Sequence, residues 1–204
     1  MNIRDWSSDV CSSDLSSEFR AQTAEITADA ENPYETAVAI ERHLESSKDY
    51  SLSVTKPDGN VAEAFTTEME AGYCVYFATA MTQMLRAEGV PARYVTGYTS
   101  GQQIDDETYV VRGLDAHAWV EVYFPDHGWV RFDPTPGDSR EDVHTNRLEQ
   151  ARAAGSENVA TAESDDVPVS DEAAAPPGNA PGEQPESDPN ETTETDDPNE
   201  STPA

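Results

Sequence analysis

Near residue 90 the hydrophobic spacing of this chain changes from helical to strand-like, and this change constrains the fold more than any other feature. Between residues 74 and 88, apolar side chains recur along one helical face: Val75, Ala78, Met81 and Leu85. Gly89 and Pro91 end that pattern, and a segment rich in β-branched and aromatic residues, typical of strands, begins at residue 93. A helical half followed by a sheet half predicts an α+β fold, with the buried helix packed on an antiparallel sheet.

Further elements are predicted on either side of this boundary. Asn32 and Pro33 suit the cap and first turn of a helix that runs to about residue 46, with Ala37, Ile40 and Leu44 on its buried face. Alternation at residues 50–54 suggests a short strand, and residues 93–98 and 108–111 suggest two more. Residues 117–124 and 129–133 flank a Pro-Asp-His-Gly turn and predict a hairpin. Residues 143–154 suggest a weak helix.

The apolar residues are unevenly distributed, which predicts three segments. Residues 151–204 contain no Leu, Ile, Met, Phe, Trp or Tyr, but eight of the 14 prolines and 14 acidic residues against one Arg. Such a composition cannot bury enough apolar surface to fold. We therefore expect a single folded domain at residues 31–138 and an acidic, Pro-rich, disordered tail at residues 139–204. Residues 1–30 are expected to be a leader, partly non-native or disordered, since Cys11 lies in a nearly repeated Ser-Ser-Asp tract.

The charge excludes several partners. Residues 1–150 carry 27 acidic and 11 basic residues, so the folded part is itself acidic. No basic patch is available to neutralise phosphates, which argues against nucleic acid and against contact with anionic membranes. The sequence has no apolar run of about 18 residues and no Cys-x-x-Cys pair, so we predict no membrane span, no metal and no cofactor. A carboxylate-rich surface with few lysines fits a halophilic protein, although an ordinary acidic surface remains an alternative.

Cys74 is the candidate nucleophile. It lies where the loop of residues 69–73 enters the predicted central helix, so unpaired backbone N–H groups and the positive end of the helix dipole face the thiol. Both favour the thiolate, and the same N–H groups can hold an oxyanion. The alternative for Cys74 on its position alone is an inert core cysteine.

His117 and Asp133 are the candidate base and orienting acid. Both have odd numbers within their strands, and the short hairpin turn places Asp133 across from residues 117–120. If the register is even, meaning that odd-numbered residues of the two strands pair with each other, the Asp133 carboxylate and the His117 imidazole lie on one face. One ring nitrogen then remains for the Cys74 thiol. Other candidates are less suited: Asp115 precedes the strand, Asp126 and His127 occupy the turn, and structural roles are expected for His43 and His144.

Four stretches together resemble the bacterial and archaeal transglutaminase core, a branch of the papain-like cysteine enzymes. They are Gly-Tyr-Cys-Val-Tyr-Phe-Ala at 72–78, Gly-Val-Pro-Ala-Arg-Tyr-Val-Thr-Gly-Tyr at 89–98, His-Ala-Trp-Val-Glu-Val-Tyr at 117–123 and Gly-Trp-Val-Arg-Phe-Asp-Pro-Thr at 128–135. The resemblance implies that Cys74 is the nucleophile, His117 the base and Asp133 the acid. Tyr73 and Trp119 are the candidate substrate-binding residues.

The resemblance implies cysteine-dependent acyl transfer on protein or peptide carboxamides through a thioester. Hydrolytic use of the same triad, as a peptidase or deamidase, and a non-catalytic peptide-binding module are the alternatives. Animal transglutaminases have Gln and Trp where Tyr73 and Val75 flank the cysteine here, and no calcium loop is present. The acidic tail resembles the linker of prokaryotic relatives, which implies an extracytoplasmic segment of a membrane-anchored protein.

Overall fold

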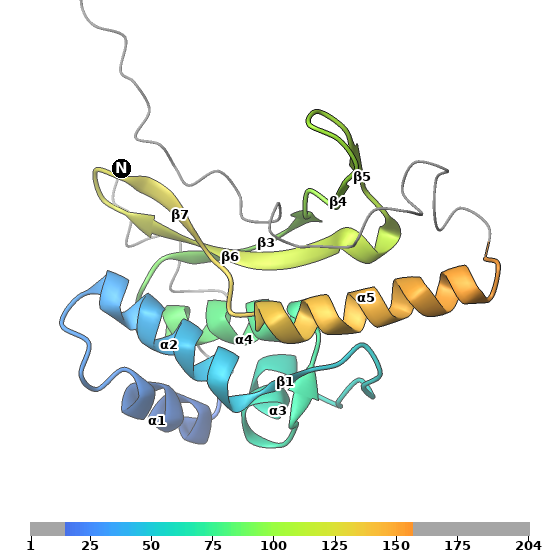
Figure 1. Cartoon of the computed structure of the whole chain (residues 1–204). Helices are drawn as coiled ribbons and strands as arrows, with labels where there is room; N and C mark the ends of the chain where they lie inside the picture. Colours follow the sequence, from blue (N-terminus) through green and yellow to red (C-terminus); the bar gives the residue numbers. More distant parts are fainter. Residues whose placement is uncertain (1–14, 157–204) are drawn as a thin grey trace, which may run out of the picture.

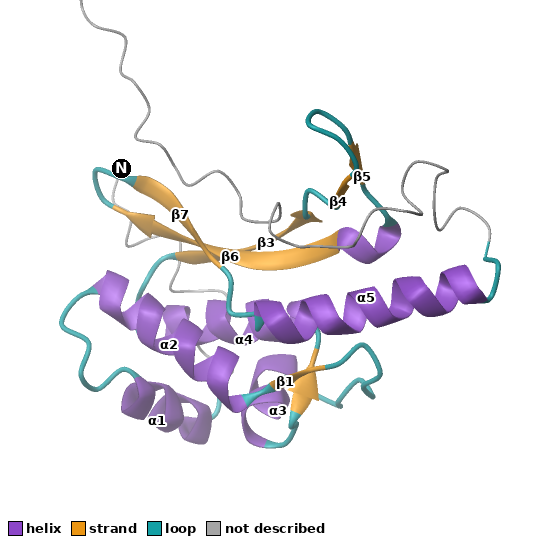
Figure 2. Ribbon diagram, viewed as in Figure 1, coloured by secondary structure: helices purple, strands orange, loops and turns teal. Residues whose placement is uncertain are grey.

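A three-stranded antiparallel sheet lies over a layer of helices (Figure 1). The computed structural model describes residues 15–156, so the predictions for Cys11 and for residues 157–204 of the tail lie outside the described residues. The sheet has the order β3-β6-β7, formed by Ala92–Tyr98, Ala116–Phe124 and Gly128–Phe132. Figure 2 shows the helices gathered on one side of this sheet. The predicted α+β architecture is confirmed.

The central helix is α4 (Cys74–Ala87), which packs against β3, β6 and α2. Phe77, Met81 and Leu85 are fully buried on its inner face. Gly89 follows with φ of 74°, and the N–H of Val90 donates to the carbonyl of Leu85. The predicted helix and its glycine terminus are therefore confirmed, because a left-handed residue suits Gly best.

Helix α2 (Pro33–Ser47) covers the core beside α4. The side chain of Asn32 accepts hydrogen bonds from the N–H groups of Tyr34 and Glu35, as an N-cap does. Its inner face consists of the three predicted residues, all with no exposed surface: Ala37, Ile40 and Leu44. The predicted start and buried stripe of this helix are confirmed.

Strands β6 and β7 form the hairpin that was predicted to carry His117 and Asp133, and its register is even. Val120 lies opposite Phe132 and Tyr123 opposite Trp129. The turn contains Asp126 with φ of 67° and Gly128 with φ of 79°. Even-numbered β6 residues Ala118, Val120 and Val122 are buried on the core side, as their alternation predicts.

Some short elements differ from the prediction. The strand expected at residues 50–54 is reduced to β1 (Asp49–Tyr50), which pairs in parallel with β2 (Ala71–Gly72) just before α4. Strand β5 (Tyr109–Val110) pairs with β4 (Gln102–Gln103) instead of joining the main sheet. Helix α3 (Val61–Thr67) was not predicted, and a 3₁₀ turn, Gly113–Asp115, precedes β6.

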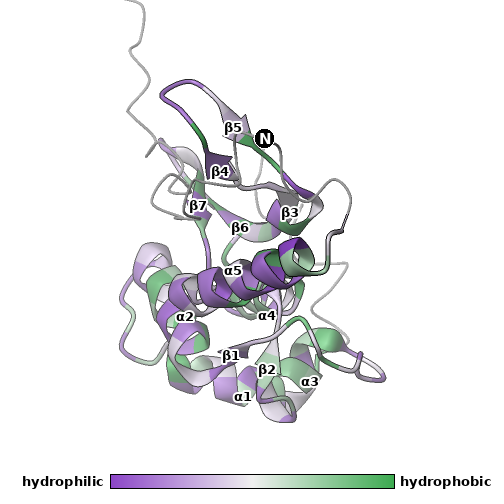
Figure 3. Ribbon diagram, turned by 45° about the vertical axis from the view of Figure 1, so that its right-hand side comes forward, coloured by the Kyte–Doolittle hydropathy of each residue, from purple (hydrophilic) through white to green (hydrophobic). Residues whose placement is uncertain are grey.

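Two helices extend the described fold beyond residues 31–138. Helix α1 (Ser17–Ile26) packs on α2 and α4, with Phe19 buried in the core. Helix α5 (Gly137–Ala153) runs across the helical layer and contacts β1. Figure 3 shows α5 as largely hydrophilic, and its buried residues are Arg140, His144 and Leu148. Its length exceeds that of the weak helix predicted at residues 143–154.

Candidate active site

Cys74 is the first residue of α4, and two short strands hold it there. The N–H of Ser51 donates to the carbonyl of Gly72, and the N–H of Asp49 donates to Glu70. The N-cap residue, Tyr73, makes no side-chain capping bond. Among the described residues, no side chain therefore caps the first N–H groups of α4, although the N–H of Tyr76 donates to the carbonyl of Tyr73. Cys74 itself is 7% exposed.

Gly72 permits the backbone before Cys74 to lie close to Phe65 and Tyr76. A Cβ added there would lie 2.7 Å from Cε2 of Phe65 and 2.9 Å from Cβ of Tyr76. Real Cβ atoms essentially never approach other atoms so closely. The β2–α4 junction therefore needs a residue without a side chain at position 72. The local sequence thus fixes the position of the cysteine as well as its identity.

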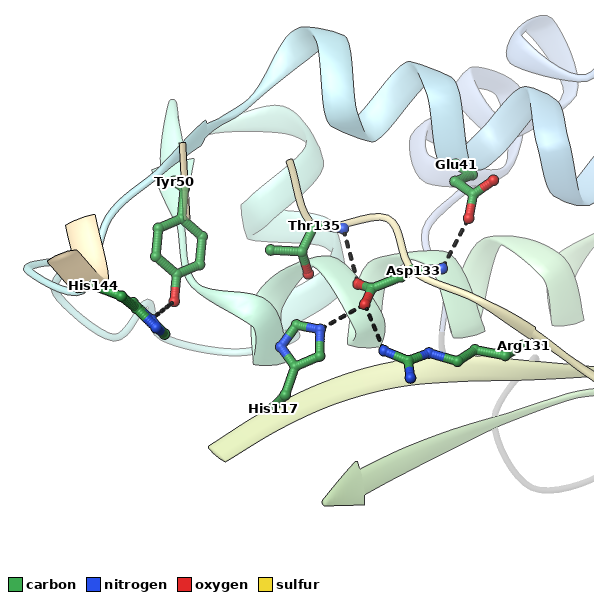
Figure 4. Close-up of polar contacts among 7 residues, drawn as sticks. All are labelled: Glu41, Tyr50, His117, Arg131, Asp133, Thr135 and His144. Carbon is green, nitrogen blue, oxygen red and sulfur yellow. Dashed lines mark hydrogen bonds and ion pairs between the residues drawn. The ribbon is translucent and has the colours of Figure 1, made fainter. Parts of the chain in front are cut away.

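His117 and Asp133 meet as the hairpin register predicts. Nε2 of His117 lies 2.6 Å from Oδ2 of Asp133, and the imidazole is buried (Figure 4). Nδ1, the second ring nitrogen, is buried and has no hydrogen bond among the described residues. His117 and Cys74 line the same pocket. The Cys74 thiol contributes to raising the pKa of His117.

Three groups hold the Asp133 carboxylate and its backbone in place (Figure 4). Nη2 of Arg131 donates to Oδ2 at 3.0 Å, and the N–H of Thr135 donates to Oδ1 at 3.3 Å. The backbone N–H of Asp133 donates to the carboxylate of Glu41 on α2 at 2.8 Å. Arg131 also lies over the ring of Trp119, 4.6 Å from its centroid. Asp133 is therefore oriented by its own hairpin and by α2.

The pKa shifts of this pair have opposite directions. Burial acts to lower the pKa of His117, but the hydrogen bond to Asp133, the interaction with the Cys74 thiol and the charge of Asp133 raise it above its ordinary value. Burial acts to raise the pKa of Asp133, but the hydrogen bond and charge of His117 and of Arg131 lower it. Each partner thus favours the charged form of the other.

The pocket at Cys74 has a volume of about 520 Å³. Its lining comes from α4, from the end of β3, from the 3₁₀ turn, from the start of β6, and from β1 and α5. Of the two predicted substrate-binding residues, Tyr73 lines this pocket. Trp119 is not among the lining residues; its ring stacks on His117 with centroids 6.3 Å apart. The substrate-binding roles of both residues stay predictions.

The sequence did not predict that Tyr50 and His144 would meet in the same pocket. Oη of Tyr50 lies 3.1 Å from Nε2 of His144, which comes from α5 (Figure 4). Burial, with the charge of Arg140, lowers the pKa of His144 to about 4. Burial, with the charge of Cys74, raises the pKa of Tyr50 to about 12. A neutral imidazole therefore faces a neutral phenol beside the thiol.

The other histidines and carboxylates considered in the sequence do not enter the site. Asp115 accepts from the N–H of Arg112 and caps the 3₁₀ turn. Asp126 and His127 are exposed in the hairpin turn, and His43 lies half-buried on α2. Within residues 15–156, no three His, Cys, Asp or Glu side chains gather in a group that could hold a metal ion.

The comparison with known families is decisive. Residues 20–134 match the sequence profile of the Transglutaminase-like superfamily. The chain belongs to this superfamily. It is 37% identical over 132 residues to the uncharacterized protein YebA of Bacillus subtilis, covering 60% of this chain and 18% of YebA. It is 39% identical over 114 residues to a protein-glutamine gamma-glutamyltransferase of Pseudomonas aeruginosa, covering 55% of this chain and 17% of that protein.

A solved structure supports the same assignment. The periplasmic domain of TgpA from Pseudomonas aeruginosa superimposes with a TM-score of 0.56 at 31% identity, covering 66% of this chain and 47% of that domain. The transglutaminase-like chain thus spans under half of this domain and under a fifth of the two curated relatives. Among the described residues, no helix is long and apolar enough to cross a membrane.

Proposed function

We propose that Cys74, His117 and Asp133 form a catalytic triad for acyl transfer on protein or peptide carboxamides. The observation that carries this proposal is that one nitrogen of the His117 ring is hydrogen-bonded within the described residues and the other is not. Nε2 is committed to Asp133, while the buried Nδ1 is unpaired in the described residues and the ring shares a pocket with Cys74. A base held in this way can serve a thiol nucleophile.

In the first half-reaction the sulfur of Cys74 attacks the carbonyl carbon of a Gln side chain. His117 takes the thiol proton and delivers it to the leaving nitrogen, so that the C–N bond breaks and ammonia departs. The N–H groups at the start of α4 would hold the oxyanion, since no side chain caps them. The product is a thioester on Cys74.

In the second half-reaction an amine attacks the thioester, the C–S bond breaks, and the amine proton returns to sulfur through His117. The product is a substituted amide, as the name of the Pseudomonas aeruginosa relative implies for that protein. Attack by water would instead give Glu, and attack on a peptide bond in the first step would give cleavage. Transfer is favoured here by the resemblance to that relative.

One assay distinguishes these outcomes. The full chain is incubated with a Gln-containing protein and a fluorescent amine, and amine incorporation, ammonia release and backbone cleavage are followed together. We expect incorporation with stoichiometric ammonia, both absent in Cys74→Ala. Ammonia without incorporation would indicate a deamidase, and cleavage would indicate a peptidase.

Alkylation tests whether the protein is a cysteine enzyme or a binding module. We expect iodoacetamide at pH 6 to label Cys74 much faster than Cys11 in the same chain, with the sites distinguished by peptide mass. Equal labelling of the two cysteines would count against catalysis and favour a non-catalytic module.

We further propose that this chain is an extracytoplasmic segment of a longer, membrane-anchored protein. Its similarity to the periplasmic domain of TgpA supports this location. Protease digestion of intact cells, which should cleave an epitope placed in this segment without lysis, tests it; protection until lysis would refute it.

A further inference from the structure

Strand β3 forms one edge of the main sheet, since it pairs only with β6 among the described strands. The hydrogen bonds that flank it show which of its backbone groups face that edge. Pro91 accepts from the N–H of Tyr123, and the N–H of Thr99 donates to Asp115. Both pairs continue the β3–β6 register, in which Ala92 lies opposite Val122.

Bonding in an antiparallel ladder repeats every second residue, so the odd-numbered residues of β3 bond to β6. The even-numbered residues therefore direct their N–H and C=O groups outward. The outward carbonyl of Ala92 accepts from Nε of Arg86. The next outward residues are Tyr94, Thr96 and Tyr98, and no backbone hydrogen bond of theirs away from β6 is found within residues 15–156. These three residues are defined here as the β3 edge.

The β3 edge lies beside the candidate nucleophile. Thr96 and Tyr98 line the same pocket as Cys74. Tyr94 pairs with Val120, so its side chain is on the sheet face that α4 covers. Burial and the nearby charge of Cys74 raise the pKa of Tyr94. A strand added to this edge would place every second side chain on the same face, at the mouth of the pocket.

The surface chemistry favours an extended and cationic polypeptide. Tyr94 and Tyr98 are 38% and 65% exposed, so their rings offer contact surface to a bound chain. The adjoining β4–β5 hairpin adds exposed Tyr109 and Val111. The whole chain has a formal net charge of −29, so lysine-containing segments are attracted and acidic ones are repelled.

We propose that the β3 edge binds the acyl-donor protein as an added β-strand, with a Gln side chain opposite Thr96 directed into the Cys74 pocket. The substrate class is thus an extended, lysine-bearing segment around a glutamine, recognised first by main-chain hydrogen bonds. This inference rests on the proposed function for the chemistry that follows binding, but the binding step is tested separately from it.

Amide exchange of the full-length Cys74→Ser protein tests the binding step. The probe is a capped heptapeptide with central Gln, flanking valines and terminal lysines. At saturating peptide we expect exchange at Tyr94, Thr96 and Tyr98 to slow by about tenfold or more. The amides of Arg93, Val95 and Gly97 serve as internal controls, because they already bond to β6. Absence of binding, or binding without protection of the β3 edge, would overturn the proposal.

Paired N-methyl peptides provide a matched control. One isomer is methylated on the second and sixth nitrogens, the other on the third and fifth. In a strand added to an edge only alternate N–H groups bond to it, so one isomer should lose about tenfold in affinity and the other should bind normally. Which isomer is weakened shows whether the strand adds antiparallel or parallel. Equal effects on both isomers would rule out strand addition.

A protein variant completes the test. Thr96→Pro removes one outward N–H, which an edge strand tolerates, whereas Thr96→Val keeps it. We expect Pro to weaken peptide binding about tenfold and Val, which keeps the N–H, to weaken it much less. If Thr96→Pro fails to fold, the N-methyl peptides decide. If the peptide binds at the β3 edge but the wild type forms no thioester with it, only the proposed function is refuted. If the thioester forms but the amides of the β3 edge are not protected, only this inference is refuted.

Discussion

At the residue scale, burial acts to lower the pKa of two histidines in one pocket, but their different partners shift the two pKa values in opposite directions. His117 gains Asp133 as a partner, and its pKa is raised despite burial. His144 faces Tyr50 and lies near the charge of Arg140, and its pKa is lowered to about 4. The first is poised to carry a proton and the second remains neutral. Their contributions to stability must therefore depend on pH with opposite signs.

The His117–Asp133 pair should stabilise the fold within a defined pH window. A raised histidine pKa stabilises fully below the unfolded value of 6.5, and this contribution is lost as the pH rises through the folded value. A lowered carboxyl pKa stabilises above the unfolded value of 3.8 and is lost as the pH falls through the folded value. We expect Asp133→Asn to lower the free energy of unfolding most between these two pH values.

Urea unfolding of both proteins across pH 3–9 measures this difference. Glu121→Gln is the control, since it removes a carboxylate of the same hairpin that pairs with Arg93 instead. A destabilisation by Asp133→Asn that is the same at all pH values would contradict the assigned pair.

His144 should make the wild type sensitive to acid. Since its folded pKa lies below the unfolded value of 6.5, the unfolded chain binds a proton first, and stability falls as the pH drops from 6.5 towards about 4. His144→Gln can still accept from Tyr50, and it should remove up to about 3 kcal/mol of this loss. Unfolding at several pH values measures it. His127→Gln, in the exposed turn, should keep the wild-type profile; a wild-type profile in His144→Gln would refute the assignment.

At the scale of elements, the position of the nucleophile depends on the β2–α4 junction. Gly72→Ala would place its Cβ 2.7 Å from Phe65 and 2.9 Å from Tyr76, so the backbone before Cys74 must move. We expect a loss of about 1–3 kcal/mol in the free energy of unfolding and slower alkylation of Cys74. Gly137→Ala, whose Cβ meets nothing within 4 Å, is the matched control. Wild-type alkylation in Gly72→Ala would show that the junction tolerates a side chain.

The elements that the sequence predicted are those with a regular apolar period. Alternation in β6 and a short turn predicted that His117 and Asp133 lie on one face if the register is even, and the observed register is even. The bond from Asp133 to Glu41 joins residues 92 positions apart, and that from Tyr50 to His144 joins residues 94 apart. Such contacts depend on how α2 and α5 pack, which no local pattern encodes.

Helix α5 shows why part of the pocket was missed. Its buried residues Arg140, His144 and Leu148 are spaced by four, but two of them are polar. A search for apolar periodicity therefore finds no buried face there. The superfamily match also ends at residue 134, before this helix begins. The four-residue spacing of Arg140 and His144 was the only signal in the sequence for this buried face.

At the scale of the whole molecule, the net charge of −29 predicts that salt stabilises the fold. Self-repulsion among carboxylates opposes compaction, and the screening length shrinks from about 10 Å at 0.1 M to about 3 Å at 1 M. Between these salt concentrations we expect the Tm at pH 7 to rise by about 3 °C or more, equivalent to about 1 kcal/mol. Differential scanning calorimetry in NaCl and in KCl measures the shift, which should be equal in both salts if screening causes it.

Near pH 4, where many carboxylates are protonated, the gain in Tm should shrink. A gain of the same size at both pH values would instead assign the effect to strengthened apolar burial, and no gain at pH 7 would remove the halophilic hypothesis.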